Sequence, residues 1–149
     1  MKATVFDERF CGIGEGPTSS GAQNERISWV DIYGRKVHSR NLITGETSEF
    51  DTAEDVGFAI PRANGGHIVG VTSGPVLRDV DGTLHQLPNR EDADGFAASR
   101  DLRWNDAKVS PQGDLFLGTM AHDHATHAGA LYQLRGDGKH IADSWVMSR

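Results

Sequence analysis

The chain of 149 residues is long enough for one domain with a hydrophobic core, and its 18 glycines and 37% hydrophobic residues favour a turn-rich protein over a helical bundle. Its formal net charge of -6 argues against nucleic acid or an anionic membrane as the main partner, because both select basic surfaces. The single cysteine, Cys11, excludes an internal disulfide, and no stretch is apolar enough for a signal peptide or a membrane span. We therefore expect a cytoplasmic protein that binds neither nucleic acid nor membranes.

Short strands rather than helices are expected along the whole chain. No segment of ten or more residues has an apolar stripe at helical spacing that is free of Gly and Pro. Runs rich in β-branched and aromatic residues, which are typical of strands, recur in three places: 26–32, 67–72 and 114–119. A second short run follows each of them: 36–40, 75–79 and 130–134.

Glycine-bearing turns occupy matching places in successive units, where glycine adopts positive φ without steric cost. These turns are Thr44-Gly45-Glu46, Asp81-Gly82, Asp137-Gly138, Asn64-Gly65-Gly66 and Pro111-Gln112-Gly113. Units of roughly 40–50 residues with about four short antiparallel strands are typical of a β-propeller. We predict an all-β chain of about three four-stranded blades near 12–51, 52–88 and 99–149, with residues 1–8 as an extra edge strand. The alternative is a single β-sandwich, although that fold does not require its turns to recur.

Three blades do not close a propeller. Propellers typically have 4–8 blades, because closure protects the faces and edges of the sheets. Either two chains self-associate to complete a ring, or this chain is part of a longer protein. The sequence favours the second interpretation.

Glu15 is the first candidate ligand for a metal. It lies in Gly12-Ile13-Gly14-Glu15-Gly16-Pro17, where the glycines let the backbone approach a ligand and leave the carboxylate unshielded. Such a carboxylate suits a hard cation such as Ca²⁺. A solvated glutamate in a turn is the alternative.

A dense polar group precedes the apolar run at 114–119. It consists of Arg103, Asn105, Asp106 and Lys108. Buried polar groups cost free energy unless they are paired, so these residues are poor core material. The pattern predicts either a heavily hydrogen-bonded turn or a functional site.

Five motifs occur in one order at consistent distances: Gly14-Glu15-Gly16-Pro17, Trp29-Val30-Asp31-Ile32, 103–113, Gly118-Thr119-Met120 and Gly129-Ala130-Leu131-Tyr132. In these motifs the chain resembles the N-terminal half of the gluconolactonase/regucalcin (senescence marker protein) family of six-bladed β-propellers. The resemblance covers nearly the whole chain and about half of a family domain.

The resemblance implies a divalent-metal lactonase that hydrolyses an aldonolactone with metal-activated water, using Ca²⁺, Zn²⁺ or Mn²⁺. Glu15 matches the first metal ligand of the family, and Arg103 and Asn105 match residues that face the substrate. Asp123 stands where the family often has an acidic group that contacts sugar hydroxyls. The other two ligands, an Asn and an Asp that is also the usual general base, belong to the second half of the family domain. A non-catalytic propeller that binds calcium or a partner is the alternative.

Two departures from the family pattern have structural implications. The residues after the first motif are Thr18-Ser19-Ser20 where the family usually has an aromatic, which predicts a loosened core in the first blade. Ala107 replaces a common glycine, which predicts a strained turn if that position needs positive φ. We interpret Asp106 as structural, accepting backbone N–H groups in a turn.

The segment His122-Asp123-His124-Ala125-Thr126-His127 nearly reproduces a metal motif of the metallo-β-lactamase fold. Thr126 occupies its acidic position, however, and no α/β alternation surrounds it. We favour a flexible loop over the channel mouth, with a histidine-bound metal hydrolase as the alternative.

Three further expectations concern single residues. Trp29, Phe116 and Leu117 are predicted in the core; His38, His67, His85 and His140 on the surface; and Cys11 as a packing residue.

Overall fold

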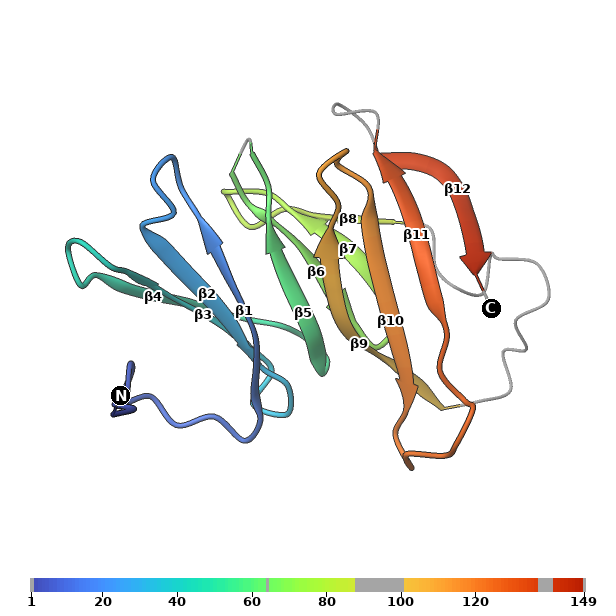
Figure 1. Ribbon diagram of the computed structural model, residues 1–149, viewed down its shortest axis with the longest axis horizontal. Helices are drawn as coiled ribbons and strands as arrows, with labels where there is room; N and C mark the ends of the chain where they lie inside the picture. Colours follow the sequence, from blue (N-terminus) through green and yellow to red (C-terminus); the bar gives the residue numbers. More distant parts are fainter. Residues whose placement is uncertain (1, 64, 88–100, 137–140, 149) are drawn as a thin grey trace.

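Figure 1 shows the computed structural model of the chain, which describes residues 2–63, 65–87, 101–136 and 141–148. Three antiparallel sheets of four strands follow one another, each with its strands in sequence order. The first sheet contains β1 (Gly14–Ser20), β2 (Arg26–Asp31), β3 (Lys36–Asn41) and β4 (Thr47–Asp51). The second contains β5 (Val56–Pro61), β6 (His67–Val71), β7 (Gly74–Arg78) and β8 (Leu84–Gln86). The third contains β9 (Leu102–Val109), β10 (Leu115–Ala121), β11 (Leu131–Gly136) and β12 (Ile141–Ser148).

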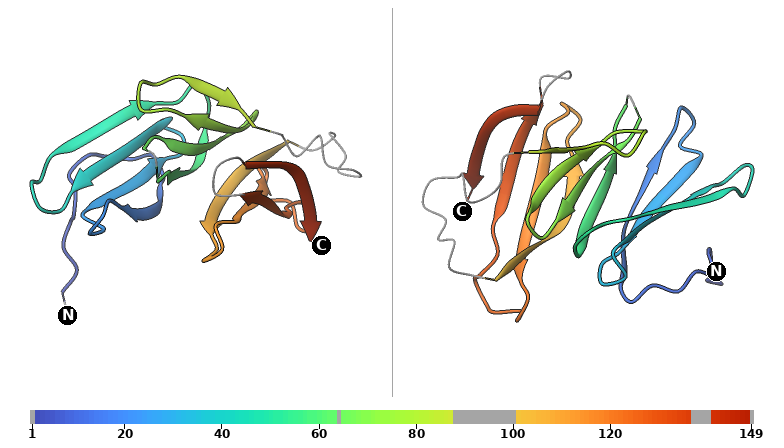
Figure 2. Two further views of the ribbon diagram at one scale, coloured as in Figure 1. Left: turned by 90° about the horizontal axis from the view of Figure 1, so that it is seen from above. Right: turned by 180° about the vertical axis from the view of Figure 1, so that it is seen from behind.

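The three sheets stand side by side as blades along an arc, and the predicted all-β propeller class is confirmed (Figures 1 and 2). The first strands of the sheets, β1, β5 and β9, run in the same direction along the concave side of the arc. Strand β5 contacts both β1 and β9. The described residues contain no helix with the length and apolar character needed to cross a membrane.

The polar group that begins at Arg103 lies inside strand β9, not in a turn ahead of a strand. Asn105 interrupts the strand as a bulge, because Trp104 pairs with Thr119 and Asp106 pairs with Gly118. The buried positions of β9 therefore do not follow the two-residue repeat that marks a strand in sequence. This interruption explains why the sequence pattern did not predict β9.

A β-bulge interrupts the pairing of every innermost strand. In β1 the register shifts between Glu15 and Thr18, and in β5 it shifts between Val56 and Phe58. Bulges bend a strand locally and redirect the neighbouring side chains. The inner edge of this protein is therefore irregular in each blade, while the strands behind it pair regularly over most of their length.

The hydrophobic core lies between neighbouring blades. One cluster joins Val30 and Val37 of the first blade to Val56 and Val69 of the second. The other joins the second blade to the third and includes Phe58, Trp104, Leu117 and Tyr132. The Trp104 ring meets the Phe58 and Tyr132 rings edge to face, at centroid distances of 6.5 and 5.3 Å. Because each blade buries its apolar face against the next, the stacking of the blades fixes the positions of the inner strands.

Several expectations about single residues are decided by the structure. Leu117 is fully buried as predicted, whereas Trp29 and Phe116 are only half-buried. His85 is exposed as predicted, but His38 is buried and His67 is half-buried. Ala107 is buried in a strand and does not have positive φ, so the predicted strain is absent. Residues 2–8 form no strand. Some predicted turns, one predicted surface histidine and parts of two predicted blades lie outside the described residues: Asn64, Asp137-Gly138, His140, residue 88 and residues 99–100.

Gly57 of β5 lies where the backbones of β5 and β9 approach each other closely. A Cβ added to Gly57 would lie 2.0 Å from the carbonyl oxygen of Trp104 and 3.0 Å from the backbone nitrogen of Asn105. Those atoms belong to the backbone of β9, which cannot move aside as a flexible side chain would. The distance between β5 and β9 therefore requires glycine at this position.

We expect Gly57→Ala to destabilise the protein by about 1–3 kcal/mol, because the methyl group forces the inner strands apart. Urea unfolding of the variant and the parent chain measures this difference. Gly118→Ala is the matched control, since its added Cβ would lie 3.7 Å from the nearest atom, an ordinary contact. Equal unfolding midpoints for the two variants would contradict this account of the β5–β9 packing.

His67 packs between the first two blades, with its ring 5.3 Å from the Phe50 ring. Burial, together with the smaller effect of the positive charges of Arg78 and Arg26, lowers the pKa of His67 from 6.5 to about 4. The folded chain therefore holds a neutral imidazole at pH values where the unfolded chain binds a proton. The contribution of His67 to the free energy of unfolding is therefore constant above pH 6.5 and decreases as the pH falls from 6.5 towards 4.

The variant His67→Gln should lose less stability than the parent chain between pH 6.5 and pH 4, because it removes the proton uptake of the unfolded state. Unfolding midpoints at several pH values across this range measure the two slopes. His124→Gln, at an exposed histidine of the loop after β10, serves as the control and should keep the parent slope. If the slope of His67→Gln equals that of the parent, the buried ring does not control acid stability.

Candidate functional site

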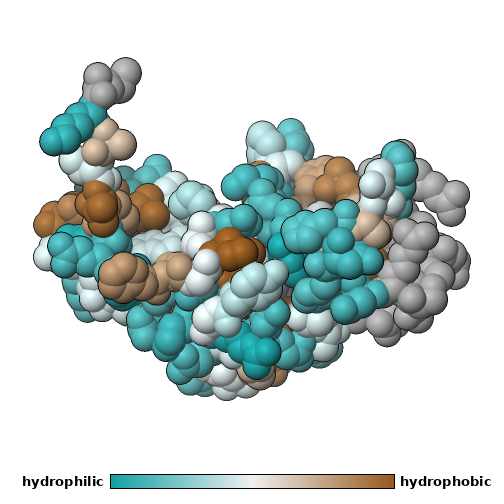
Figure 3. Space-filling view, turned by 90° about the horizontal axis from the view of Figure 1, so that it is seen from below, coloured by the Kyte–Doolittle hydropathy of each residue, from teal (hydrophilic) through white to brown (hydrophobic). Residues whose placement is uncertain are grey.

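The candidate site lies at the end of the propeller where the inner strands begin. Glu15 is the second residue of β1, and Arg103 is the second residue of β9. The loop that connects β10 to β11 and carries Asp123 lies at the same end (Figure 1). Seen from this end, the molecule is hollowed between its two outer blades and largely hydrophilic along the hollow (Figure 3).

The segment before Glu15 is anchored by one carboxylate. Asp31 Oδ1 accepts hydrogen bonds from the backbone N–H groups of Gly12 (2.9 Å), Ile13 (3.2 Å) and Gly34 (3.1 Å). Burial acts to raise the pKa of Asp31, but the bonds from Gly34, Gly12 and Ile13 together hold it below its ordinary value. Asp31 therefore stays ionised and fixes the chain that leads into Glu15.

Glu15 itself is exposed, and the glycine that follows it has positive φ (61°). Glu15 also lines a small pocket of about 280 Å³, together with residues that include Arg9 and Trp29. A carboxylate held on a fixed backbone with space beside it is suited to receive a cation.

Asn105 is the bulged residue of β9, and its side chain is half-buried. Within the described ranges its amide group has no hydrogen-bond partner. The close contact of its backbone with Gly57 fixes its position against β5. The amide is therefore held rigidly while its oxygen and nitrogen remain available to a ligand.

Arg103 is 6% exposed, and its guanidinium contacts only neighbouring uncharged groups. Nη1 donates to the Trp104 carbonyl at 3.1 Å, and Nη2 lies 3.0 Å from Met120 Sδ. No described carboxylate lies within ion-pair distance of it. A buried cation without an anionic partner favours binding of an electron-rich oxygen. Met120 holds the guanidinium in place, a role that the sequence did not indicate.

Asp123 is exposed, and its Oδ1 accepts a hydrogen bond from the backbone N–H of Ala125 at 2.9 Å. In the described part of the chain no hydrogen bond or ion pair joins Asp123 or Glu15 to Arg103 or Asn105. The structure thus places these four residues at one end of the inner strands without direct contacts among them. Asp106 accepts the N–H of Ala107 at 2.8 Å, as a structural residue would, but within a strand instead of a turn.

Thr119 and Ala130 close the base of the loop that carries Asp123. The N–H of Thr119 donates to the Ala130 carbonyl at 2.9 Å, and the N–H of Ala130 donates to Thr119 Oγ1 at 3.0 Å. A Cβ on Gly129 would lie 2.3 Å from the Thr119 carbonyl oxygen, so the close approach requires glycine. The two motifs that contain Thr119 and Gly129 therefore lock the two ends of one loop together.

The histidines of this loop do not assemble into a metal site. His124 and His127 have positive φ, and the nearest ionic contact of His122 is to Asp101 at 3.7 Å. Among the described residues, one group of three potential metal ligands lies close together: Cys11, Asp31 and His38. No sequence pattern predicts that group, because its members come together only when the segment before β1 folds onto β2 and β3.

Comparisons with known proteins identify the family of the chain. The family described as "SMP-30/Gluconolactonase/LRE-like region" matches residues 13–146. The chain belongs to this family. It is 30% identical over 130 residues to a 6-deoxy-6-sulfogluconolactonase from Pseudomonas putida, a match that covers 87% of this chain and 42% of the relative. It is 31% identical over 139 residues to a pentonolactonase from Haloferax volcanii, covering 93% of this chain and 44% of the relative.

Solved structures of the family have the same fold. A calcium-binding protein, regucalcin, from Agrobacterium tumefaciens matches with a TM-score of 0.78 and 25% identity, covering 96% of this chain and 45% of that chain. A luciferin-regenerating enzyme matches with a TM-score of 0.74 and 23% identity, covering 92% and 45%. The chain thus spans less than half the length of the relatives it matches. These similarities do not test the cytoplasmic location expected from the sequence, which stays a prediction.

We expect Thr119→Val to destabilise the protein by about 1–3 kcal/mol, because it leaves the Ala130 N–H without its hydroxyl acceptor. Amide hydrogen exchange should become faster at Ala130 and along the loop that carries Asp123. Thr47→Val, at an exposed position in β4, is the matched control and should leave this exchange unchanged. Unaltered exchange at Ala130 in Thr119→Val would show that the hydroxyl does not hold the loop.

Proposed function

We propose that this chain supplies the N-terminal half, residues 1–149, of a metal-dependent site that hydrolyses a sugar lactone of the aldonolactone class. The placement of Glu15, Arg103 and Asn105 at the same end of inner strands that flank β5 carries this proposal. Family membership and the names of the lactonase relatives support it. The remaining part of the site would come from a second half, because a second copy of this chain would only duplicate Glu15.

Glu15 fits a divalent cation as one ligand of an incomplete set. Its carboxylate is exposed and follows a backbone segment that Asp31 holds in place. Calcium takes about 6–8 oxygen ligands, and smaller cations about 4–6, so Glu15 needs further donors from the rest of the protein. A bound Ca²⁺, Zn²⁺ or Mn²⁺ would polarise the lactone carbonyl and acidify a water molecule.

The residues of β9 would bind and orient the substrate. The buried Arg103 guanidinium lacks an anionic partner, so its N–H groups favour an oxygen on which negative charge develops. The Asn105 amide is fixed by the bulge and offers both a donor and an acceptor to the ring oxygens and hydroxyls. Asp123 would accept hydrogen bonds from sugar hydroxyls at the mouth of the channel. Holding the ring in one orientation lowers the entropic part of the barrier.

In the protein that contains the complete site, Glu15→Gln should lower metal-dependent hydrolysis of gluconolactone by more than about 100-fold, beyond the 10–100-fold losses typical of residues that only support a ligand. The rate is measured with and without added Ca²⁺, Mn²⁺ or Zn²⁺. Glu46→Gln, at an exposed glutamate in the turn between β3 and β4, is the matched control. Undiminished metal-dependent activity in Glu15→Gln would remove Glu15 from the site.

A non-catalytic calcium-binding module is the second candidate, because one structural neighbour is described as a calcium-binding protein. Calorimetric titration with Ca²⁺ separates the two functions when it is combined with the lactone assay. Saturable binding that Glu15→Gln abolishes, without turnover of any lactone, favours the module. The mass of the native species shows whether two copies associate to complete the ring.

A further inference from the structure

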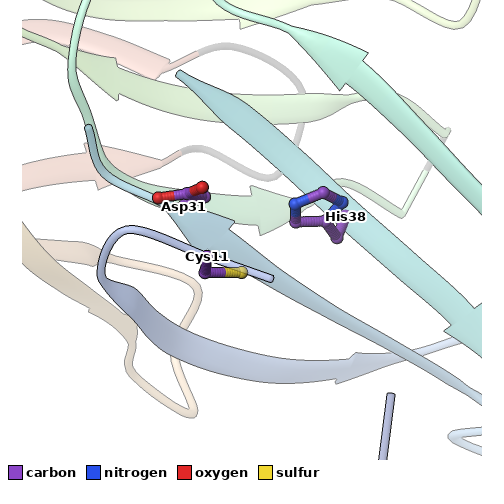
Figure 4. Close-up of side chains that lie close together, drawn as sticks. All are labelled: Cys11, Asp31 and His38. Carbon is purple, nitrogen blue, oxygen red and sulfur yellow. The ribbon is translucent and has the colours of Figure 1, made fainter. Parts of the chain in front are cut away.

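A cluster of metal-ligating side chains lies on the first blade, formed by residues outside the proposed lactone site. Ligand atoms of Cys11, Asp31 and His38 all lie within 4.8 Å of one another. Figure 4 shows the three side chains together, from the segment before β1, the end of β2 and the middle of β3. A thiolate, a carboxylate and an imidazole are each protein ligands of zinc.

His38 has a buried imidazole without hydrogen bonds. The residue is 2% exposed, and among the described residues neither ring nitrogen has a hydrogen-bond partner. Buried polar atoms nearly always form hydrogen bonds, so two ring nitrogens that form none require an explanation. One nitrogen of the ring is turned towards Asp31 and Cys11 (Figure 4). A cation between these side chains would satisfy it.

Glu49 lies on the other side of the imidazole. Its Oε2 is 3.2 Å from His38 Nδ1, close enough for an ionic contact although the angles are not those of a hydrogen bond. A proton on Nδ1 is favoured by this carboxylate, and that tautomer leaves Nε2 as the metal-binding nitrogen. Carboxylate groups commonly orient metal-bound histidines in this way. The Trp29 ring also packs against His38, at a centroid distance of 5.5 Å, and fixes the plane of the imidazole.

Asp31 is ionised and rigid. Its Oδ1 receives three backbone N–H groups, which leaves its second oxygen available for a metal. Cys11 is half-buried in a segment without regular secondary structure, so its side chain can adjust. Donor atoms around a tetrahedral zinc ion are about 3.3–3.8 Å apart, so the cluster needs to contract by about 1 Å.

We propose that Cys11, Asp31 and His38 form a zinc site that clasps the N-terminal segment onto the first blade. Binding releases the thiol proton of Cys11 to the solvent, and the thiolate and the Asp31 carboxylate together neutralise the charge of Zn²⁺. Three protein ligands leave a fourth position open to water or a small ligand. Soft thiolate and imidazole ligands select Zn²⁺ over Ca²⁺ and Mn²⁺, which distinguishes this site from the carboxylate site at Glu15.

Cobalt substitution tests the site directly. Because Cys11 is the single cysteine of the chain, a thiolate-to-cobalt charge-transfer band on titration with Co²⁺ can come only from this residue. We expect one equivalent of Co²⁺ to produce the band and one equivalent of Zn²⁺ to abolish it. Zn²⁺ should also slow the reaction of Cys11 with a thiol reagent by at least about tenfold, whereas Ca²⁺ should not, since thiolates prefer soft ions.

Two variants separate the proposed site from adventitious binding. His38→Gln removes the imidazole and should abolish the band and the protection of the thiol by Zn²⁺. His124→Ala removes an imidazole from the loop after β10 and should leave both unchanged. Glu15→Gln should also leave both unchanged, so the outcome is independent of lactone hydrolysis. Absence of the band in the parent chain, or a band that persists in His38→Gln, would overturn the proposal.

Discussion

The close packing of β5 between β1 and β9 determines where every candidate functional group lies. Gly57 allows the backbone of β5 to approach the Trp104 carbonyl of β9, and no larger residue fits at that distance. The buried aromatic contacts of Phe58 and Trp104 hold the same pair of strands from the core side. The inner strands are therefore fixed relative to one another, and the polar residues near their beginnings lie at the same end of these strands.

Asp31 connects the fold to both candidate sites. Its carboxylate ties the segment before β1 to the turn after β2, and through that segment it positions Glu15. The same carboxylate lies beside Cys11 and His38. A metal bound there would reinforce an anchor that already exists. The stability of the first blade and the position of Glu15 thus depend on one buried charge.

The sequence predicted the second and third strands of each blade well and the first strands poorly. The runs at 26–32, 67–72 and 114–119 have the β-branched and aromatic residues typical of strands, and all three lie largely within strands. By contrast, β1 contains two glycines and a proline, and the bulge at Asn105 breaks the alternation of β9. These strands exist because they pack against neighbouring blades, a cause that no local pattern contains.

The same reasoning applies to the candidate site residues. The location of Glu15, Arg103 and Asn105 at one end of the inner strands follows from the order of the family motifs. The burial of His38 does not, since its neighbours Lys36 and Arg40 are polar, and His38 lies beside Cys11 of the segment before β1 only in the folded chain. Contacts that form only in the folded chain, such as Met120 against Arg103, leave no signal in a single sequence.

Paramagnetic broadening of amide signals by Mn²⁺ tests the central claim most directly. Mn²⁺ prefers oxygen ligands and should bind at Glu15 rather than at the thiol-containing cluster. The account predicts that broadening is strongest at residues 14–16 of β1 and extends across the hollow to residues 103–106 of β9. Broadening confined to β1, or centred on the loop at 122–127, would contradict the claim that these strands share one site.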